Sequence, residues 1–222
     1  DNKCKKLEPI GWNLKSLNMI DLSGFDKRLT ETNFLVACDV NNPLYGQNGA
    51  AYIYGPQKGA NKIIVKDLDE GLKNFSSITA NLLSNDNSQI PGTGAAGGLG
   101  FALLSYLGAT LKPGIEIVLD YLKIDKLINN VDMVITGEGK IDSQSKMGKV
   151  LSGIGIYSLK YNKKVIAFGG IVENELSLKE YGISTIIQIN RRNLSIADAM
   201  KKSNAKLLLR DAVEDFFKSK NA

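Results

Sequence analysis

The hydrophobic pattern in the second half of the chain predicts a parallel sheet. Three short runs rich in β-branched residues, at 131–136, 164–169 and 184–189, are separated by stretches of helical periodicity. Strands that alternate with helices form right-handed βαβ units, in which the strands lie parallel and the helices cover the sheet. We therefore expect these three runs to form one parallel sheet. The helical stretches are expected over residues 149–161, 173–181 and 195–218.

The first half of the chain has a less regular pattern. The run FLVACDV at 34–40 predicts a strand with an acidic residue near its end. Asn61 can cap a helix whose apolar positions recur at helical spacing, and residues 99–107 predict a buried helix. Pro113 suits the first position of a further helix, because the N–H that proline lacks would have no helical partner there. A soft domain boundary is expected at 122–130.

Composition is that of an average globular protein and excludes several classes. Apolar residues make up 43% of the 222 residues, and no apolar run approaches the roughly 18 residues of a membrane span. The first residues are polar and form no signal peptide, and the two cysteines have no metal-ligand spacing, so we expect a cytoplasmic protein without a membrane partner. The net charge of +5 is spread over short basic pairs, which form a solvated surface or bind an anionic substrate. No recognition motif accompanies the charge, so no nucleic-acid partner is expected.

The chain contains no histidine. Its absence excludes Ser-His-Asp and Cys-His catalysis, zinc bound by histidine and a histidine general base. Acid–base chemistry in this protein must therefore use carboxylates, lysine, tyrosine or water.

A glycine-rich segment at 92–98 is the first candidate site. Its letters GTGAAG match the dinucleotide-binding fingerprint, but polar NDNSQIP precedes it where the fingerprint needs an apolar strand, so we reject NAD binding. No Gly-Lys-Ser/Thr follows, so the segment is not a Walker loop either. Two interpretations stay open: the backbone N–H groups before the following helix bind a phosphate, or the glycines only allow close helix packing.

Asp39 and Lys58 are candidates in the loops around the first strand. Asp39 ends the strand FLVACDV, where a carboxylate can bind a metal or orient a substrate hydroxyl, or can simply cap the turn that follows. Lys58 stands between glycines in GPQKGA, where a cation can meet phosphate, although most loop lysines are only solvated.

The strongest local signal is VDMVITGEGKID, a strand that runs into Gly-Glu-Gly. Glycines on both sides of Glu138 predict a sharp turn there, with the carboxylate at the end of the strand. Glu138 and Asp142 together could hold Mg²⁺ through oxygen ligands, and the alternative is an exposed Glu in a turn. Lys149 follows at the start of a helix, a position that favours anions.

Four segments in this order resemble class I glycerate kinases: DLSGFDKRL, ACDVNNPLYGQNGAAYIYGPQKGA, PGTGAAGGLGFALLSYLGATLKPGIEIVLD and DMVITGEGKIDSQSKMGKV. The resemblance implies an α/β, two-domain glycerate kinase fold. One domain is a Rossmann-like parallel-sheet domain made from both ends of the family's chain, and the second is a middle α/β domain. Residues 1–125 resemble the latter part of the middle domain, and residues 126–222 resemble the C-terminal part of the Rossmann-like domain.

The sequence departs from the family pattern in two ways. The family's N-terminal portion, with its Gly-Gly-Ser-Ala-Thr-Asn-Asp segment, is not in these 222 residues, so we expect a fragment. A sheet deprived of its neighbouring strands exposes an edge, and self-association could cover it. Ser145 stands where the family usually has Thr, a change that keeps the hydroxyl.

The resemblance implies ATP-dependent phosphorylation of D-glycerate, with ATP and Mg²⁺ at the site. Within the matched motifs we expect Asp39 to orient or deprotonate the hydroxyl, and Glu138 to act in catalysis and, with Asp142, on the metal. Anionic oxygens are expected to meet Lys58, Lys149, Gly94, Gly97 and Gly98. The alternatives are a dehydrogenase, which the glycine pattern alone suggests, and a truncated relative that binds small acids or regulates without catalysis.

Overall fold

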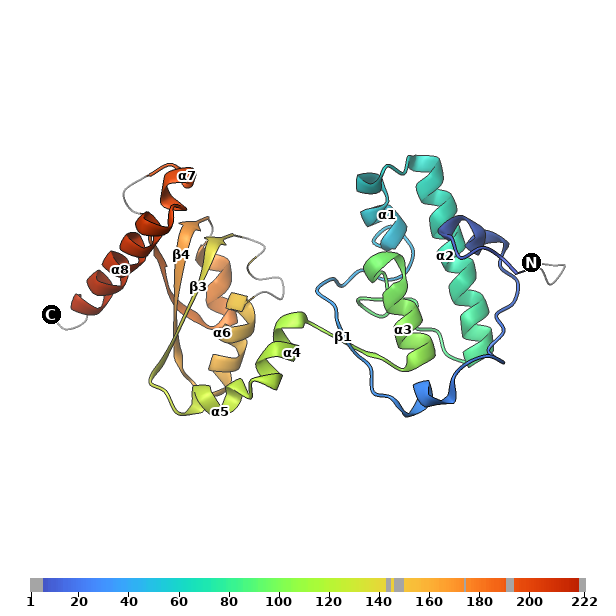
Figure 1. Cartoon of the computed structure of the whole chain (residues 1–222), viewed down its shortest axis with the longest axis horizontal. Coiled ribbons are helices and arrows are strands. Elements are labelled where there is room, and N and C mark those ends of the chain that lie inside the picture. The colour runs from blue at the N-terminus through green and yellow to red at the C-terminus, as the bar shows by residue number, and fades with distance from the viewer. Residues whose placement is uncertain (1–5, 143–144, 146–149, 174, 191–193, 220–222) are drawn as a thin grey trace. The chain divides into compact units, whose positions relative to one another are not determined.

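The computed structural model of the chain describes residues 6–142, 145, 150–173, 175–190 and 194–219. The chain divides into two compact units, an N-terminal unit at Asp1–Gly114 and a C-terminal unit at Ile115–Ala222 (Figure 1). The boundary expected from the sequence, between residues 125 and 126, falls inside helix α5 (Ile124–Asn129). Both units combine helices with parallel strands, so the expected α/β class is confirmed. Among the described residues, no helix is both long enough and apolar enough to cross a membrane.

The C-terminal unit is built on a three-stranded sheet. Its strands are β3 (Met133–Ile141), β4 (Lys164–Val172) and β5 (Ile183–Gln188), in the order β3-β4-β5. Both neighbouring pairs are parallel, as the three apolar runs predicted. The carboxyl ends of all three strands therefore meet at one edge of the sheet.

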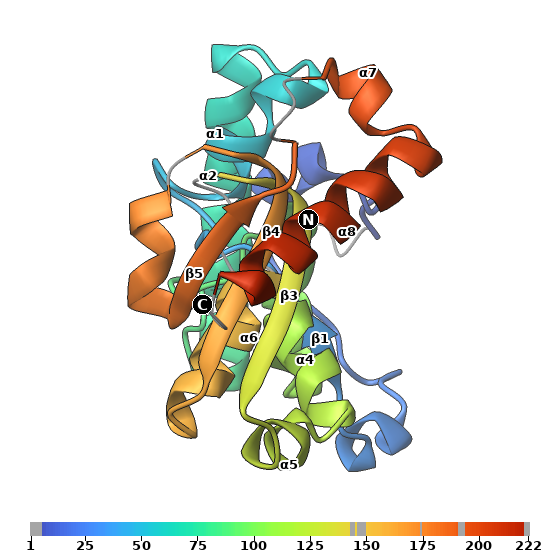
Figure 2. The ribbon, with the colours of Figure 1, turned by 90° about the vertical axis from the view of Figure 1, so that its left-hand side faces the viewer.

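Helices cover both faces of this sheet because its strands are apolar at consecutive positions. Val165 and Ala167 of β4 face α6 (Val150–Lys160) and the 3-10 helix η6 (Glu175–Tyr181). Ile166 and Phe168 point to the opposite face, where they pack with Ala212 of α8 (Lys202–Lys218). Figure 2 shows α8 crossing this face of the sheet. Such burial on both faces is typical of parallel sheets.

The sharp turn expected at Glu138 does not form. β3 continues through both glycines to Ile141, and Glu138 pairs with Gly169 of β4. A Cβ on Gly137 would lie 2.7 Å from the carbonyl oxygen of Phe168, so this glycine permits close approach of two strands. The prediction was wrong because glycine suits a tight strand contact as well as a turn.

The long helix expected at 195–218 is two helices, α7 (Ile196–Ala199) and α8. Ser195 caps α7 by accepting from the N–H of Asp198, and Lys201 between the helices has an extended backbone. Asn204 donates from its side-chain amide to the carbonyl oxygen of Asp198. Local hydrogen bonds of short polar side chains thus compete with a continuous helix.

Helices α4 (Gly114–Tyr121) and α5 pack against α6. Leu119, Ile128 and Tyr157 form a small apolar cluster there. The hydroxyl of Tyr157 donates to a carboxylate oxygen of Asp120. The helix expected after Pro113 is thus confirmed, whereas α5 occupies a stretch for which only a boundary was expected.

The N-terminal unit has a two-stranded parallel sheet of β1 (Leu35–Ala37) and β2 (Thr110–Lys112). Asn61 caps α2 (Lys62–Leu83) by accepting from two backbone N–H groups, as expected. Residues 99–107 form the expected helix, α3 (Leu99–Leu107), although Leu99 itself is exposed. The remaining elements are α1 (Ala50–Tyr54) and the 3-10 helices η1 (Gly11–Ser16), η2 (Lys27–Glu31), η3 (Pro56–Lys58) and η4 (Ala95–Gly97).

The core of the N-terminal unit lies between α1, α2 and α3. Leu44, Val65, Leu72 and Phe101 are buried in it, and Phe101 meets Phe75 edge to face with ring centroids 5.4 Å apart. This core holds the loop that follows β1 against the glycine-rich segment before α3.

Candidate functional site

The carboxyl end of β3 carries a hydrogen-bonded acidic cluster. Ser145 donates from Oγ to Oε2 of Glu138 at 2.8 Å, and the backbone N–H of Asp142 donates to the same Oγ at 3.2 Å. The backbone N–H of Ser145 donates to the carbonyl oxygen of Asp142 at 3.0 Å. Ser145 is 1% exposed, so this hydroxyl is a fixed link between the two acidic residues that the sequence singled out.

Lys140 places a positive charge beside this cluster. Its Nζ lies 2.9 Å from a carboxylate oxygen of Glu173 and 3.7 Å from one of Asp142. The hydrogen bond that Lys140 donates to Glu173, followed by the charge of that carboxylate and then by the charge of Asp142, raises the pKa of Lys140. Lys140 therefore stays protonated at neutral pH, and sequence analysis missed it because an exposed lysine in a strand has no distinctive pattern.

The oxygen donors at this edge suit a hard cation. Mg²⁺ is usually held by one or two carboxylates together with substrate phosphates and water. Glu138 and Asp142 supply such carboxylates, linked through Ser145. Within the described ranges, no group of three or more His, Cys, Asp or Glu is arranged to hold a metal by itself. The residues thus fit a cation that is shared with phosphate oxygens.

A pocket of about 520 Å³ opens beside the acidic cluster. Its floor is the carboxyl ends of the three strands, and its wall is α7 and the first turns of α8. Glu138 and Lys140 are its charged lining residues. The other lining residues are Gly139, Gly170, Ile171, Ile189, Asn190, Ile196, Ala199, Met200, Ala205 and Leu208.

Asp39 lies just after the end of β1, as the sequence predicted, and its carboxylate bonds to a residue that follows the end of β2. Because β1 and β2 are parallel, the residues that follow them lie at the same edge. The backbone N–H of Gly114 donates to Oδ1 of Asp39 at 2.8 Å. In the described part of the chain no second donor reaches this carboxylate, and the side chain is exposed. Asp39 therefore holds the start of α4 and still presents an oxygen to solvent.

The glycine-rich segment packs tightly against the loop after β1. The N–H of Gly94 donates to the carbonyl oxygen of Asn42 at 2.9 Å, and a Cβ at Gly94 would lie 2.3 Å from the carbonyl oxygen of Pro43. Gly98 has a φ of 101°, and its N–H donates to the carbonyl oxygen of Ala95. These contacts favour the packing interpretation for Gly94 and Gly98. The residues before Gly92 form turns, which agrees with the rejection of a dinucleotide fingerprint.

Gly97 differs from its neighbours. It has a φ of 72°, and a Cβ there would meet no atom within 4 Å. Its backbone conformation requires glycine, but packing does not. Phosphate binding by this segment stays a prediction, and Gly97 is the glycine with open space beside it.

Two side chains that sequence analysis missed organise this region. Asn42 donates from Nδ2 to the carbonyl oxygen of Asn48 and accepts at Oδ1 from the hydroxyl of Tyr54. Thr93 is fully buried, and its hydroxyl donates to the carbonyl oxygen of Ile90 at 2.7 Å. The doublet Asn41-Asn42 before Pro43 is a turn signal that could have drawn attention to this loop.

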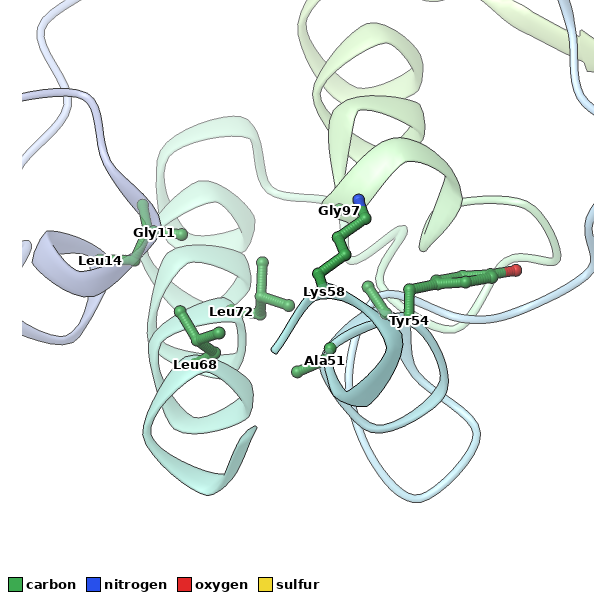
Figure 3. A pocket seen from close by; sticks show the side chains of 10 residues that line it. Gly11, Leu14, Ala51, Tyr54, Lys58, Leu68, Leu72 and Gly97 are labelled. Carbon is green, nitrogen blue, oxygen red and sulfur yellow. The ribbon is translucent and has the colours of Figure 1, made fainter. Parts of the chain in front are cut away.

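Lys58 lines a cavity of about 140 Å³ together with Gly97. Figure 3 shows its side chain extending along the cavity, whose apolar wall includes Ala51, Leu68 and Leu72. Within the described residues, no ion pair or hydrogen bond is made by its ammonium group. Lys58 and Gly97, which were both expected to meet anionic oxygens, thus line one cavity.

The remaining candidates fall outside these groups. Lys149 lies outside the described residues. Glu138 and Asp142 belong to the C-terminal unit, and Asp39, Lys58 and the glycines belong to the N-terminal unit.

Comparisons with known proteins identify the family. A model of the glycerate kinase family matches residues 1–219. The chain is 44% identical over 180 residues to "Glycerate 2-kinase" of Escherichia coli (strain K12), which covers 81% of this chain and 47% of the relative. It is 42% identical over 202 residues to "Glycerate kinase" of Bacillus cereus (strain ATCC 10987 / NRS 248), which covers 90% of this chain and 53% of the relative.

A solved structure agrees with the sequence relatives. The chain resembles a crystal structure described as glycerate kinase 2 from Salmonella typhimurium LT2, with a TM-score of 0.72 and 37% sequence identity. The match covers 94% of this chain and 55% of that chain. The chain thus spans about half the length of the relatives that it matches. With the family model covering nearly every residue, this chain belongs to the glycerate kinase family.

Proposed function

We propose that the chain supplies half of an ATP-dependent glycerate kinase, which transfers the γ-phosphoryl group of ATP to a hydroxyl of D-glycerate. The observation that carries the proposal is the Glu138–Ser145–Asp142 cluster at the carboxyl end of β3. Ligands of open parallel sheets bind beyond the carboxyl ends of the strands. The names of the relatives give the substrate class.

Phosphoryl transfer needs positioning and neutralisation of charge more than covalent chemistry by the protein. Such a reaction suits a chain without histidine. Glu138 and Asp142 would hold Mg²⁺, which would supply positive charge to neutralise the phosphate oxygens. Lys140 can change partners from Glu173 to a phosphate oxygen without leaving the cluster, because its side chain is half exposed.

The N-terminal unit supplies the groups for the acceptor in this proposal. Asp39 orients or deprotonates the hydroxyl of D-glycerate through the oxygen that does not accept from Gly114. Lys58, beside the open space at Gly97, binds an anionic oxygen. Lys149 would meet a further anionic oxygen.

The test uses the protein encoded by the complete reading frame. It is incubated with ATP, Mg²⁺ and D-glycerate, and ³¹P NMR resolves the phosphoglycerate formed. Glu138→Gln is expected to lower turnover by about 100-fold or more, since it removes a charge aimed at the reacting phosphates. The matched control is Glu173→Gln, whose exposed carboxylate pairs only with Lys140 in the described residues. Equal turnover in the wild type and Glu138→Gln would remove Glu138 from the machinery.

A non-catalytic, acid-binding relative is the second candidate, favoured by the coverage of only about half of each relative. The same experiment on the 222-residue chain alone separates the two. Binding of D-glycerate without formation of phosphoglycerate, in both the chain and the complete protein, would support the non-catalytic candidate.

A further inference from the structure

The pocket of about 520 Å³ between the strand ends and α7–α8 has the size and lining of a small-molecule site. Such sites usually measure about 300–1,000 Å³, with mostly apolar walls and a few polar groups. Here isoleucine, leucine and methionine residues line the pocket, together with the charged residues Glu138 and Lys140. All of these residues belong to the C-terminal unit, so the pocket lies within one compact unit.

Gly139 provides an independent sign of a ligand. It lies in β3, its φ is not positive, and a Cβ there would meet no atom of the described residues within 4 Å. Among these residues, neither backbone conformation nor packing requires glycine at this position, where a β-branched residue would favour the strand. The missing side chain keeps the floor of the pocket open and leaves the backbone accessible to a bound molecule.

Gly170 lies next to Gly139 in the floor of the pocket. A Cβ on Gly170 would lie 2.5 Å from the carbonyl oxygen of Gly139, so strand packing accounts for this second glycine. The contrast sets Gly139 apart as a position kept free for a ligand.

We propose that this pocket binds the nucleoside part of the phosphoryl donor, with the base between the floor at Gly139 and the wall at Leu208. The proposal rests on the proposed function. The apolar walls shield the flat faces of a base, and the phosphates extend toward Glu138 and Lys140, which also line the pocket. The reacting phosphate then lies at the acidic cluster, where the cation is expected.

The test measures binding of ADP, adenosine and tripolyphosphate to the 222-residue chain by isothermal titration calorimetry. Gly139→Val fills the floor with a side chain that meets open space and suits a strand. This variant is expected to lower the affinity for ADP and adenosine at least tenfold, while the affinity for tripolyphosphate stays the same. The matched control is Gly24→Val, since Gly24 also has open space around its missing Cβ and lines none of these pockets.

A second variant keeps the test informative if Gly139→Val does not fold, as judged by circular dichroism. Ala205→Leu narrows the pocket from α8, and its control is Ala197→Leu on the exposed side of α7. Loss of ADP and adenosine binding in Ala205→Leu alone supports the pocket. The proposal is overturned if a folded pocket variant binds ADP with unchanged affinity. It is also overturned if the variant weakens the binding of tripolyphosphate as much as the binding of ADP.

The outcome is separate from that of the proposed function. Loss of ADP binding in the pocket variants, together with no phosphorylation of D-glycerate by the complete wild-type protein, would keep the nucleoside site and reject the kinase. Phosphorylation of D-glycerate with unchanged ADP affinity in the variants would keep the kinase and reject this pocket.

Discussion

Ser145 donates its hydroxyl proton to Glu138 and accepts from the backbone N–H of Asp142 through the same oxygen. One buried hydroxyl therefore fixes the distance between two acidic residues that lie at the end of β3. The two carboxylates repel each other because they carry like charges. The Ser145 hydroxyl holds both residues in place, since it bonds to the carboxylate of Glu138 and to the backbone of Asp142.

Ser145→Ala removes this link. We expect it to destabilise the protein by about 1–3 kcal/mol, because the partly buried N–H of Asp142 and the partly buried carboxylate of Glu138 lose their hydrogen-bond partner. Urea unfolding measures the change, and phosphorylation of D-glycerate is expected to fall as well. Ser145→Thr keeps the hydroxyl and should retain both properties. Equal stability of Ser145→Ala and the wild type would show that the hydroxyl does not organise the cluster.

Asp39 has a structural bond to Gly114 and a proposed catalytic role, and two substitutions separate them. Asp39→Asn keeps an oxygen that accepts from the Gly114 N–H, so stability should change by less than about 0.5 kcal/mol. Turnover should fall by about 100-fold or more, since an amide is no base. Asp39→Ala is expected to lose stability also. Turnover measurements and thermal melting of both variants check this prediction. Full activity of Asp39→Asn would show that Asp39 has a structural role alone.

Gly94 lies closer to the loop after β1 than any side chain allows. Gly94→Ala would place Cβ 2.3 Å from the carbonyl oxygen of Pro43, so the loop and the glycine-rich segment must separate. We expect a loss of about 1–3 kcal/mol in unfolding free energy. Gly24→Ala is the control, because its Cβ meets no atom within 4 Å. Similar melting temperatures for the two variants would contradict the close contact.

The Tyr157–Asp120 hydrogen bond predicts a pH dependence of stability. The hydrogen bond to Asp120 and then burial raise the pKa of Tyr157 well above its usual range. Such a group stabilises the fold below its unfolded pKa of about 10, and the stabilisation is lost as pH rises from there through the folded pKa. Tyr157→Phe should cost about 1.5–3 kcal/mol at pH 7, since the bond is to a charged acceptor.

Urea unfolding of the wild type and Tyr157→Phe at pH 7 and at pH 10.5 measures this effect. The difference between the two proteins should shrink at the higher pH. A difference that is independent of pH would show that the variant loses packing and not the hydrogen bond.

Several elements followed directly from local sequence. Asn61 caps α2, α3 spans the expected residues, and the three apolar runs pair as parallel strands. These predictions succeed because capping and periodicity act within a few residues. The break between α7 and α8 was missed because it depends on hydrogen bonds of Ser195 and Asn204 that compete with a pattern suiting one helix.

The sequence by itself determined the parallel sheet, the acidic residues at its edge, the absence of histidine from these 222 residues and the resemblance to a kinase family. Only the tertiary structure decided that β3 continues through Gly137 and Gly139, because the backbone of β4 approaches too closely for a side chain at Gly137. It also placed Ser145 between Glu138 and Asp142, and it opened a pocket over Gly139. The physical reason is that a glycine is compatible with a turn, with a close backbone contact and with open space in a pocket. Its neighbours in the tertiary structure decide which of these occurs.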